Sequence, residues 1–276
     1  MILGFPFLTA SFDADARAYI NTSGATDRAA INHFVKAVKR LGLWSSMVCW
    51  PLRSSQNAGT GSTAYSLGGL GTYNGTLVNG PTWGADGVLF NANNKYITLG
   101  NTGITTGAFS NISVARMGST TTNGNLMHTT LFSPSNASVG SGFYSYDGNN
   151  AGENSILFNG LTSGFRRPAS GNTVVRNIGN YYRLSTVSTL SAPTTATGLI
   201  KINGLTAVTS GAAGTGTLPY TSTEVTSILF ANSQSSVRDE SGVFSMWVVG
   251  TQISEETSEQ IRALYKSTLG QGLGLP

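Results

Sequence analysis

The feature that most constrains the fold of this chain is a long succession of short apolar runs separated by turn-forming pairs. From Trp44 onward, apolar side chains recur with a period of two, which is the spacing of a half-buried strand. Pairs such as Asn74-Gly75, Asn79-Gly80 and Asp147-Gly148 separate the runs and favour tight hairpins. Since no helical pattern interrupts these runs, the sequence predicts an antiparallel sandwich or barrel rather than alternating βα units.

The predicted strands cover most of the chain after residue 45. They are residues 46–52, 75–78, 87–91, 96–99, 109–117, 125–132, 142–146, 155–158, 173–178, 181–187, 198–202, 226–230 and 243–249. Charged residues make up only 10% of the chain, against about 25% in an ordinary soluble domain, so neutral polar groups must keep the protein in solution. The 276 residues suffice for one large domain with a sizeable core.

Charge and cysteine content restrict the functional classes. The net charge of +4 comes from 16 basic and 12 acidic residues that are mostly scattered, so no contiguous basic face for nucleic acid is predicted. Cys49 is the only cysteine, and with His33 and His128 it cannot complete a zinc cage, so we expect no metal, no cofactor and a buried, inert thiol. No apolar run approaches the roughly twenty residues of a membrane span, so no membrane insertion is predicted.

Helical spacing precedes the first predicted strand. The apolar stripe of this helix consists of Ile31, Phe34, Val35, Val38 and Leu41. Thr26 or Asp27 can cap its start, and Gly42 can end it in the left-handed conformation.

A second helix is predicted at the end of the chain. Ser254 is a good N-cap, and Glu255 and Glu256 fall in the first turn, where the helix dipole favours acids. Its apolar side is formed by Ile261, Leu264 and Tyr265. We expect this helix to pack on the outside of the sandwich and the tail after it, GQGLGLP, to be mobile or fixed by a partner.

The order of several segments carries a family resemblance. These segments are YNGTLVNGPTW at 73–83, GVLF at 87–90, KYITL at 95–99, LIKING at 199–204, the closing strand 243–249 and the helix 253–265. This order resembles the concanavalin A-like, laminin-G-type jelly rolls over roughly residues 65 to 270. The resemblance implies an all-β, antiparallel jelly-roll sandwich over residues 46–276 that ends in a short C-terminal helix, preceded by an N-terminal arm and helical segment over residues 1–45.

The N-terminal segment carries a second resemblance. Its residues are AYI at 18–20, GATD at 24–27, AIN at 30–32, VK at 35–36, LGLW at 41–44 and Met47. This pattern looks like the leader of tailed-phage virion proteins that carry such a sandwich. It concerns where the protein works, because the fold itself hosts lectins, enzymes and structural modules.

No arrangement of catalytic residues is evident. Glycoside hydrolysis needs two facing carboxylates, and jelly-roll glucanases carry acids at alternating positions of one strand, a string that this chain lacks. A pair of carboxylates from distant strands is left open. The Gly-x-Ser-x-Gly elbow, the phosphate-binding loop and the dinucleotide fingerprint are missing, so we predict no catalytic residues and a protein that is not an enzyme.

One predicted hairpin, residues 142–153, combines aromatic and oxygen-bearing side chains. Aromatic faces stack on sugar rings, and carboxylates and amides bind hydroxyl groups or calcium. The candidate ligands are Tyr144, Tyr146, Asp147, Asn149, Asn150 and Glu153. The alternative is a plain hairpin in which the aromatic side chains pack and Asp and Asn shape the turns.

These observations lead to a predicted function and two alternatives. The prediction is a non-enzymatic structural protein of a phage virion, a capsid decoration, head fibre or tail appendage that contacts other virion proteins, is repeated as a homo-oligomer and is assembled in the host cytoplasm. Residues 1–12 and the side chains of Ile31, Phe34, Val35 and Val38 are the predicted attachment side. The alternatives are a carbohydrate-binding or receptor-binding virion protein that meets a host-surface glycan and, after it, a glycoside hydrolase.

Overall fold

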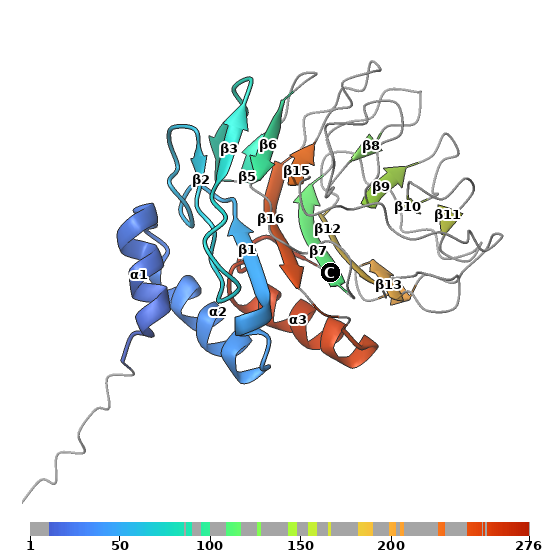
Figure 1. Cartoon of the computed structure of the whole chain (residues 1–276), viewed down its shortest axis with the longest axis horizontal. Coiled ribbons are helices and arrows are strands. Elements are labelled where there is room, and N and C mark those ends of the chain that lie inside the picture. The colour runs from blue at the N-terminus through green and yellow to red at the C-terminus, as the bar shows by residue number, and fades with distance from the viewer. Residues whose placement is uncertain are drawn as a thin grey trace, which may run out of the picture.

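Helices from both ends of the chain pack beside a set of antiparallel sheets. The computed structural model describes residues 11–85, 87–89, 95–99, 109–116, 126–127, 143–147, 154–158, 165–166, 182–189, 199–202, 205–206, 226–229, 242–249, 251 and 253–275. The helices are α1 (Ala14–Ser23), α2 (Arg28–Arg40) and α3 (Glu255–Ser267), with a short 3-10 turn, η1 (Trp44–Ser46), between α2 and the first strand. Figure 1 shows the three helices on one side of the sheet that contains the first and last strands.

The strands are β1 (Met47–Pro51), β2 (Thr63–Ala64), β3 (Gly75–Val78), β4 (Thr82–Gly84), β5 (Gly87–Leu89), β6 (Tyr96–Leu99), β7 (Phe109–Arg116), β8 (Leu126–Met127), β9 (Phe143–Asp147), β10 (Asn154–Phe158), β11 (Phe165–Arg166), β12 (Tyr182–Thr189), β13 (Leu199–Ile202), β14 (Leu205–Thr206), β15 (Thr226–Leu229) and β16 (Gly242–Val249).

These strands form one large and two smaller sheets. The largest runs in the order β14-β13-β12-β7-β16-β5-β4, and β1 also pairs with β16. The others run β11-β10-β9-β8 and β15-β6-β3-β2. Every strand pair within the described residues is antiparallel, which confirms the antiparallel class predicted from the period of two.

Most predicted strands reappear with small shifts of their ends. The predicted strands 75–78 and 96–99 coincide with β3 and β6, and 109–117 matches β7 to within one residue. Four short strands, β2, β4, β11 and β14, were not predicted because two or three residues cannot show an alternating pattern. The predicted strand 173–178 lies outside the described residues.

Helix α1 was not predicted, because half of its side chains are polar and most of the others are alanines, so its apolar side is narrow. Asp13 caps it, accepting a hydrogen bond from the Asp15 amide at 2.9 Å. The helix ends at Gly24, whose φ of 71° lies in the left-handed region that glycine adopts without strain. Tyr19 and Ile20 are buried in the core, and they fix the orientation of the helix.

Helix α2 follows the predicted helix closely, but its surroundings differ from those expected. Gly42 ends this segment with a φ of 71°, as predicted. Asp27 occupies the N-cap position without a capping bond, because its Oδ2 atom instead accepts a hydrogen bond from Gln56 Nε2 at 3.0 Å. The amides of Thr26 and Asp27 donate to the Ser55 carbonyl at 2.9 and 2.8 Å. The start of α2 is therefore fixed by a distant loop rather than by its own cap.

The predicted attachment role of the α2 stripe is wrong in one respect: its side chains are not available. Ile31, Phe34, Val35 and Val38 are 0–1% exposed. They belong to one buried cluster with side chains of β1, β7 and α3. Burying such side chains contributes roughly 1.5–3 kcal/mol each, so the stripe is part of the core and cannot form a free contact surface. Residues 1–10 of the predicted arm lie outside the described residues.

Helix α3 and the tail after it complete the same cluster. Ser254 caps α3 as predicted, accepting a hydrogen bond from the Thr257 amide at 3.1 Å. The tail GQGLGLP was expected to be mobile or held by a partner, but its Leu273 and Leu275 are buried in the cluster, as is Leu269 just before it. These leucines therefore act as core residues.

Strand β1 is buried over its whole length, since it is covered from two sides. Met47 and Cys49 belong to the cluster that the helices share. Val48 and Trp50 alternate with them, and Trp50 is also fully buried, with its Nε1 atom donating to the Tyr73 carbonyl at 2.7 Å. The predicted boundary between residues 45 and 46 stays a prediction, although the segments on its two sides share one hydrophobic core.

Candidate functional site

A pocket opens between α1 and the loop that precedes β3. Its volume is about 280 Å³. One wall is the face of α1 formed by Asp15, Ala18, Tyr19 and Thr22, which are spaced three and four residues apart as one helix face requires. The opposite wall is the loop of residues 65–69 with Thr72 and Asn74, and Trp44 completes the lining.

The loop wall lies directly against β1 and η1. The backbones of Cys49 and Leu67 exchange two hydrogen bonds of 2.7 Å. The Gly69 amide donates to the Trp44 carbonyl at 2.9 Å, and the Leu70 amide to the Met47 carbonyl at 3.1 Å. The loop therefore runs along η1 and the first half of β1 as an additional, irregular strand.

This close approach explains the glycines of the loop. A Cβ atom at Gly68 would lie 2.2 Å from the Met47 carbonyl oxygen, and one at Gly69 would lie 2.7 Å from the Trp44 carbonyl oxygen. Neither distance is compatible with a side chain, since the obstacle is backbone. The pocket wall is consequently formed here by bare main chain.

Side-chain hydrogen bonds fix the two ends of the loop. The amide and the hydroxyl of Ser66 both donate to Asn74 Oδ1, at 3.0 and 3.3 Å, and the Tyr73 amide donates to Ser66 Oγ at 2.8 Å. Asn57 holds Tyr65 by accepting its amide and donating to its carbonyl, both at 2.9 Å. These intramolecular bonds hold the loop in one conformation.

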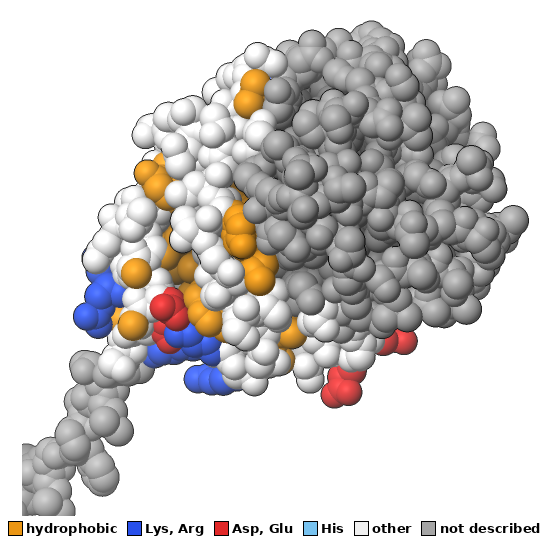
Figure 2. Space-filling view, viewed as in Figure 1, with side chains coloured by type: hydrophobic (Ala, Val, Ile, Leu, Met, Phe, Trp, Pro, Cys, Tyr) orange, Lys and Arg blue, Asp and Glu red, His pale blue; other side chains and the backbone are white. Residues whose placement is uncertain are grey.

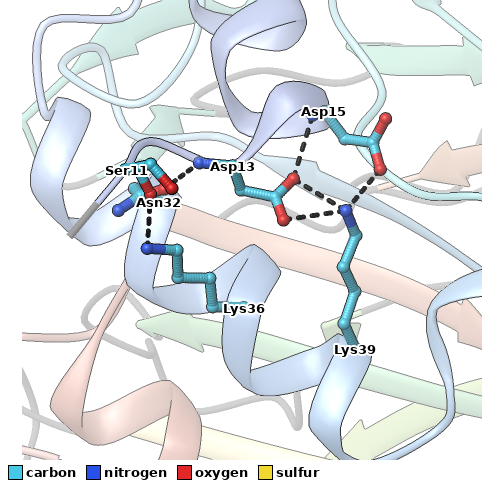
Figure 3. A network of polar contacts seen from close by, with 6 residues as sticks. All are labelled: Ser11, Asp13, Asp15, Asn32, Lys36 and Lys39. Atoms are coloured by element: carbon cyan, nitrogen blue, oxygen red, sulfur yellow. Dashed lines mark hydrogen bonds and ion pairs between the residues drawn. The ribbon is translucent and has the colours of Figure 1, made fainter.

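A cluster of charges lies beside the α1 wall (Figure 3). Lys39 of α2 lies 2.7 Å from Asp13 Oδ1 and 2.6 Å from Asp15 Oδ2, and the Asp13 amide donates to Asn32 Oδ1 at 2.8 Å. Lys36 donates to the Ser11 carbonyl at 2.7 Å. The Lys39 ammonium also lies 5.3 Å from the centroid of the Trp44 ring, within cation–π range. Lys39 therefore connects the charge cluster to the lining of the pocket.

The ion pair shifts the pKa values of its members. Burial raises the pKa of Asp13, but hydrogen bonds from Lys39 and the amides of Asp15 and Ala16, together with the Lys39 charge, outweigh it and hold the pKa below its usual value. Burial lowers the pKa of Lys39, whereas bonds to the two carboxylates raise it above its usual value. Both groups are thus held in their charged forms at neutral pH.

The Cys49 thiol and the Tyr19 phenol near the pocket are both buried and stay protonated at neutral pH. Burial raises the pKa of the Cys49 thiol well above its usual value, which confirms the inert thiol predicted from its apolar surroundings. Burial and the neighbouring Cys49 raise the pKa of the Tyr19 phenol, whose hydroxyl donates to the Gln56 carbonyl at 2.8 Å. Neither group is a nucleophile at neutral pH.

The described surface is poor in charge. In Figure 2 most of it consists of uncharged polar side chains and backbone, with the charged side chains gathered toward the helical edge. Within the part of the chain that the structure describes, no three His, Cys, Asp or Glu side chains lie close enough together to hold a metal ion. No helix in that part is both long and apolar enough to cross a membrane.

The residues predicted to form a ligand loop are only partly described. Tyr144, Tyr146 and Asp147 lie on β9, in register with Leu157, Ser155 and Asn154 of β10. Asn149, Asn150 and Glu153 lie outside the described residues. The backbone pairing confirms a hairpin at this place, and its use as a binding site stays a prediction.

Sequence reasoning missed the pocket beside α1. Trp44 is only half-buried and lines the pocket, whereas Trp50 is fully buried in the core. The sequence of α1 has no stripe of large apolar residues at helical spacing, so the helix that forms one wall of the pocket was not predicted. The signal that could have found the site is the glycine-rich string SLGGLGTYNG at 66–75, since closely spaced glycines accompany close approach of two backbones.

Comparison with known proteins gives the class of fold. No family model matches the sequence, and no curated protein matches it. Among solved structures, a mutant of Trypanosoma rangeli sialidase displaying trans-sialidase activity is similar with a TM-score of 0.60 and 12% identity, over 88% of this chain and 38% of that chain. The binding domain of botulinum neurotoxin serotype D is similar with a TM-score of 0.56 and 9% identity, over 82% of this chain and 53% of that chain.

This chain therefore spans only 38% and 53% of the lengths of those two chains. At such low identity the likeness concerns fold alone. Together with the antiparallel sheets, it assigns the chain to the β-sandwich class.

Proposed function

We propose that this chain is a non-enzymatic structural protein of a tailed-phage virion, in which a helix-capped jelly-roll sandwich of the concanavalin A-like type acts through protein–protein contacts. The proposal is supported by one observation above all. The leader whose sequence resembles that of phage virion proteins is folded into the sandwich, because its buried side chains share a core with β1 and α3.

Several of the residues that carry the leader resemblance lie at this junction. Tyr19 and Ile20 of α1, and Ile31 and Val35 of α2, are buried in the shared cluster, as is Met47 at the start of β1. This shared core supports the proposal, because it joins the leader to the sandwich.

The surface suits a protein that works by repeated contacts. Weakly charged, polar surfaces allow copies of one chain to approach each other without strong repulsion, and virion symmetry multiplies a modest contact area. With the α2 stripe buried, attachment falls to other parts of the chain. We propose that it involves other virion proteins and further copies of this chain.

The test is incorporation into particles. An epitope inserted between Asn79 and Gly80, an exposed turn where both residues have a positive φ, leaves the described core untouched. We expect the tagged chain to co-purify with particles, to be labelled by antibody at regularly repeated positions and to give density by cryo-electron microscopy. Full-length, folded protein that accumulates in infected cells but is missing from purified particles would refute the proposal; untagged particles are the control.

Carbohydrate binding is the second candidate, and the structural neighbours favour it. One similar structure, with a TM-score of 0.55 and 10% identity, is Trypanosoma rangeli sialidase in complex with a difluorinated nononic acid, and another is a toxin binding domain. A receptor-binding appendage on a virion combines both candidates. Loss of glycan binding on Tyr146→Ala or Asp147→Ala would support the hairpin β9–β10 as the site, and a folded protein that binds no glycan on an array would count against this candidate.

A further inference from the structure

The pocket between α1 and the 65–74 loop has the properties of a small-ligand site. Its volume of about 280 Å³ is slightly below the roughly 300–1,000 Å³ typical of ligand pockets. That size suits one ring-sized ligand rather than a peptide. The pocket is assembled from segments far apart in the sequence, since α1, η1 and the loop all contribute to its lining.

Several polar groups of the lining have unused bonding capacity. The hydroxyls of Thr22, Tyr65 and Thr72 make no hydrogen bond to another residue of the described ranges, and neither does the Nδ2 atom of Asn74, whose Oδ1 is occupied by Ser66. These groups are neutral and include both donors and acceptors. They match a ligand that carries several hydroxyl groups.

Aromatic surface lies next to these hydroxyls. Trp44 and Tyr65 are half-buried and line the pocket. An aromatic ring combines an apolar face with rigidity, which suits stacking on the apolar C–H face of a sugar ring. Lys39 lies 5.3 Å from the Trp44 ring centroid and restricts the orientation of the indole.

The negative charge in the pocket lining is neutralised by a neighbouring lysine. Asp15 is the acidic residue of the lining, and its Oδ2 atom lies 2.6 Å from Lys39. A cationic ligand would have to compete with Lys39 for the Asp15 carboxylate. An acidic ligand would be repelled by two carboxylates, because Asp13 is paired with the same Lys39 ammonium group. An uncharged ligand neither competes with Lys39 nor is repelled by the carboxylates.

We propose that this pocket binds a neutral sugar residue, a hexose or N-acetylhexosamine unit of a polysaccharide. The ring lies against Trp44 or Tyr65, and its hydroxyls bond to Thr22, Thr72 and Asn74. The fixed loop backbone reduces the entropy lost on binding. The proposal deepens the second candidate function by naming its site and ligand class, and it does not depend on the virion role.

The test uses the full-length protein on an array of neutral and acidic oligosaccharides, followed by titration calorimetry with the best neutral glycan. Ala18→Trp fills the pocket from an exposed position of α1 and should abolish binding. Ala263→Trp makes the same change at an exposed position of α3, outside the lining, and should leave the affinity unchanged.

A smaller change keeps the test valid if the tryptophan variant folds poorly. Thr72→Val removes one exposed hydroxyl and should weaken binding about fivefold, the value of one net hydrogen bond. Neutral glycans bound by wild type and by Ala263→Trp, but lost in Ala18→Trp, support the proposal. Binding of acidic glycans only, or neutral binding that persists in Ala18→Trp, overturns it. In the latter case carbohydrate binding survives at another site, and the Tyr146→Ala variant tests the β9–β10 hairpin.

Discussion

Helices α1 and α2 are in contact, but they differ in how much of their surface is buried in the core. Helix α2 directs a full apolar stripe into the core, and its positions can be substituted only at a large cost in stability. Helix α1 buries fewer large side chains and presents Asp15, Ala18 and Thr22 to a pocket. Helix α2 therefore stabilises the sandwich through its apolar stripe, whereas α1 contributes fewer core side chains and lines the pocket with one face.

The strongest challenge to this contrast is a core substitution in α2. Phe34→Ala removes a side chain that is 0% exposed, and we expect it to lower the free energy of unfolding by about 3–5 kcal/mol. Urea denaturation followed by circular dichroism measures the change. His33→Ala, at the exposed neighbouring position, should change stability by no more than about 0.5 kcal/mol. A Phe34→Ala loss below about 1 kcal/mol would mean that the stripe is not packed as described.

The loop opposite α1 offers the next largest effect. Gly68→Ala places a Cβ atom 2.2 Å from the Met47 carbonyl oxygen, so the backbone must move, at a cost of about 1–3 kcal/mol beyond any conformational strain. Gly61→Ala is the control, because its φ is also positive but its Cβ atom would meet nothing within 4 Å. Equal stabilities of the two variants in thermal denaturation would contradict the close contact between loop and β1.

The ion pair that joins the two helices has a smaller effect, and it depends on pH. Asp13→Asn should cost about 1 kcal/mol or less near neutral pH, since the pair is partly exposed. The pKa of Asp13 is lowered on folding, so its contribution is present above the unfolded pKa of about 3.9 and is lost as the pH falls through the folded value. The pKa of Lys39 is raised, so its contribution is present below about 10.4 and is lost as the pH rises through the folded value.

The free energy of unfolding measured from pH 2 to pH 11 tests both the loss of the Asp13 contribution at acidic pH and the loss of the Lys39 contribution at alkaline pH. The stability difference between wild type and Asp13→Asn should be largest on the plateau between about pH 4 and pH 10 and should shrink on both sides. A difference that stays constant across the whole range would show that Lys39 and Asp13 do not interact in the folded protein.

The smallest expected effect on stability belongs to the pocket. Thr72 is exposed, and its hydroxyl bonds to no other described residue, so Thr72→Val should change the free energy of unfolding by no more than about 0.5 kcal/mol. Its effect should be on glycan affinity alone. A large loss of stability would place Thr72 in the framework of the fold and remove it from the recognition surface.

The positions of many strands and helices could be predicted from the sequence, but their tertiary contacts could not. The alternating apolar runs located β3 and β6 correctly, and Ser254 located the start of α3, because these features depend on local chemistry. The stripe of α2 was recognised, but its partners come from β1, β7 and α3, which no local pattern can reveal. The pocket was missed for the same reason: Thr22, Trp44 and Asn74 come together only through the fold.

The central claim is that the helices at the two ends of the chain and the sandwich form one cooperative unit. Native-state hydrogen exchange of the full chain tests it directly, because it measures the opening free energy of each amide. We predict that the amides in the middle of α2, such as Val35, exchange with the same opening free energy and the same denaturant dependence as Val48 and Cys49 of β1. Exchange of α2 through a low-energy opening that leaves β1 fully protected would contradict the claim.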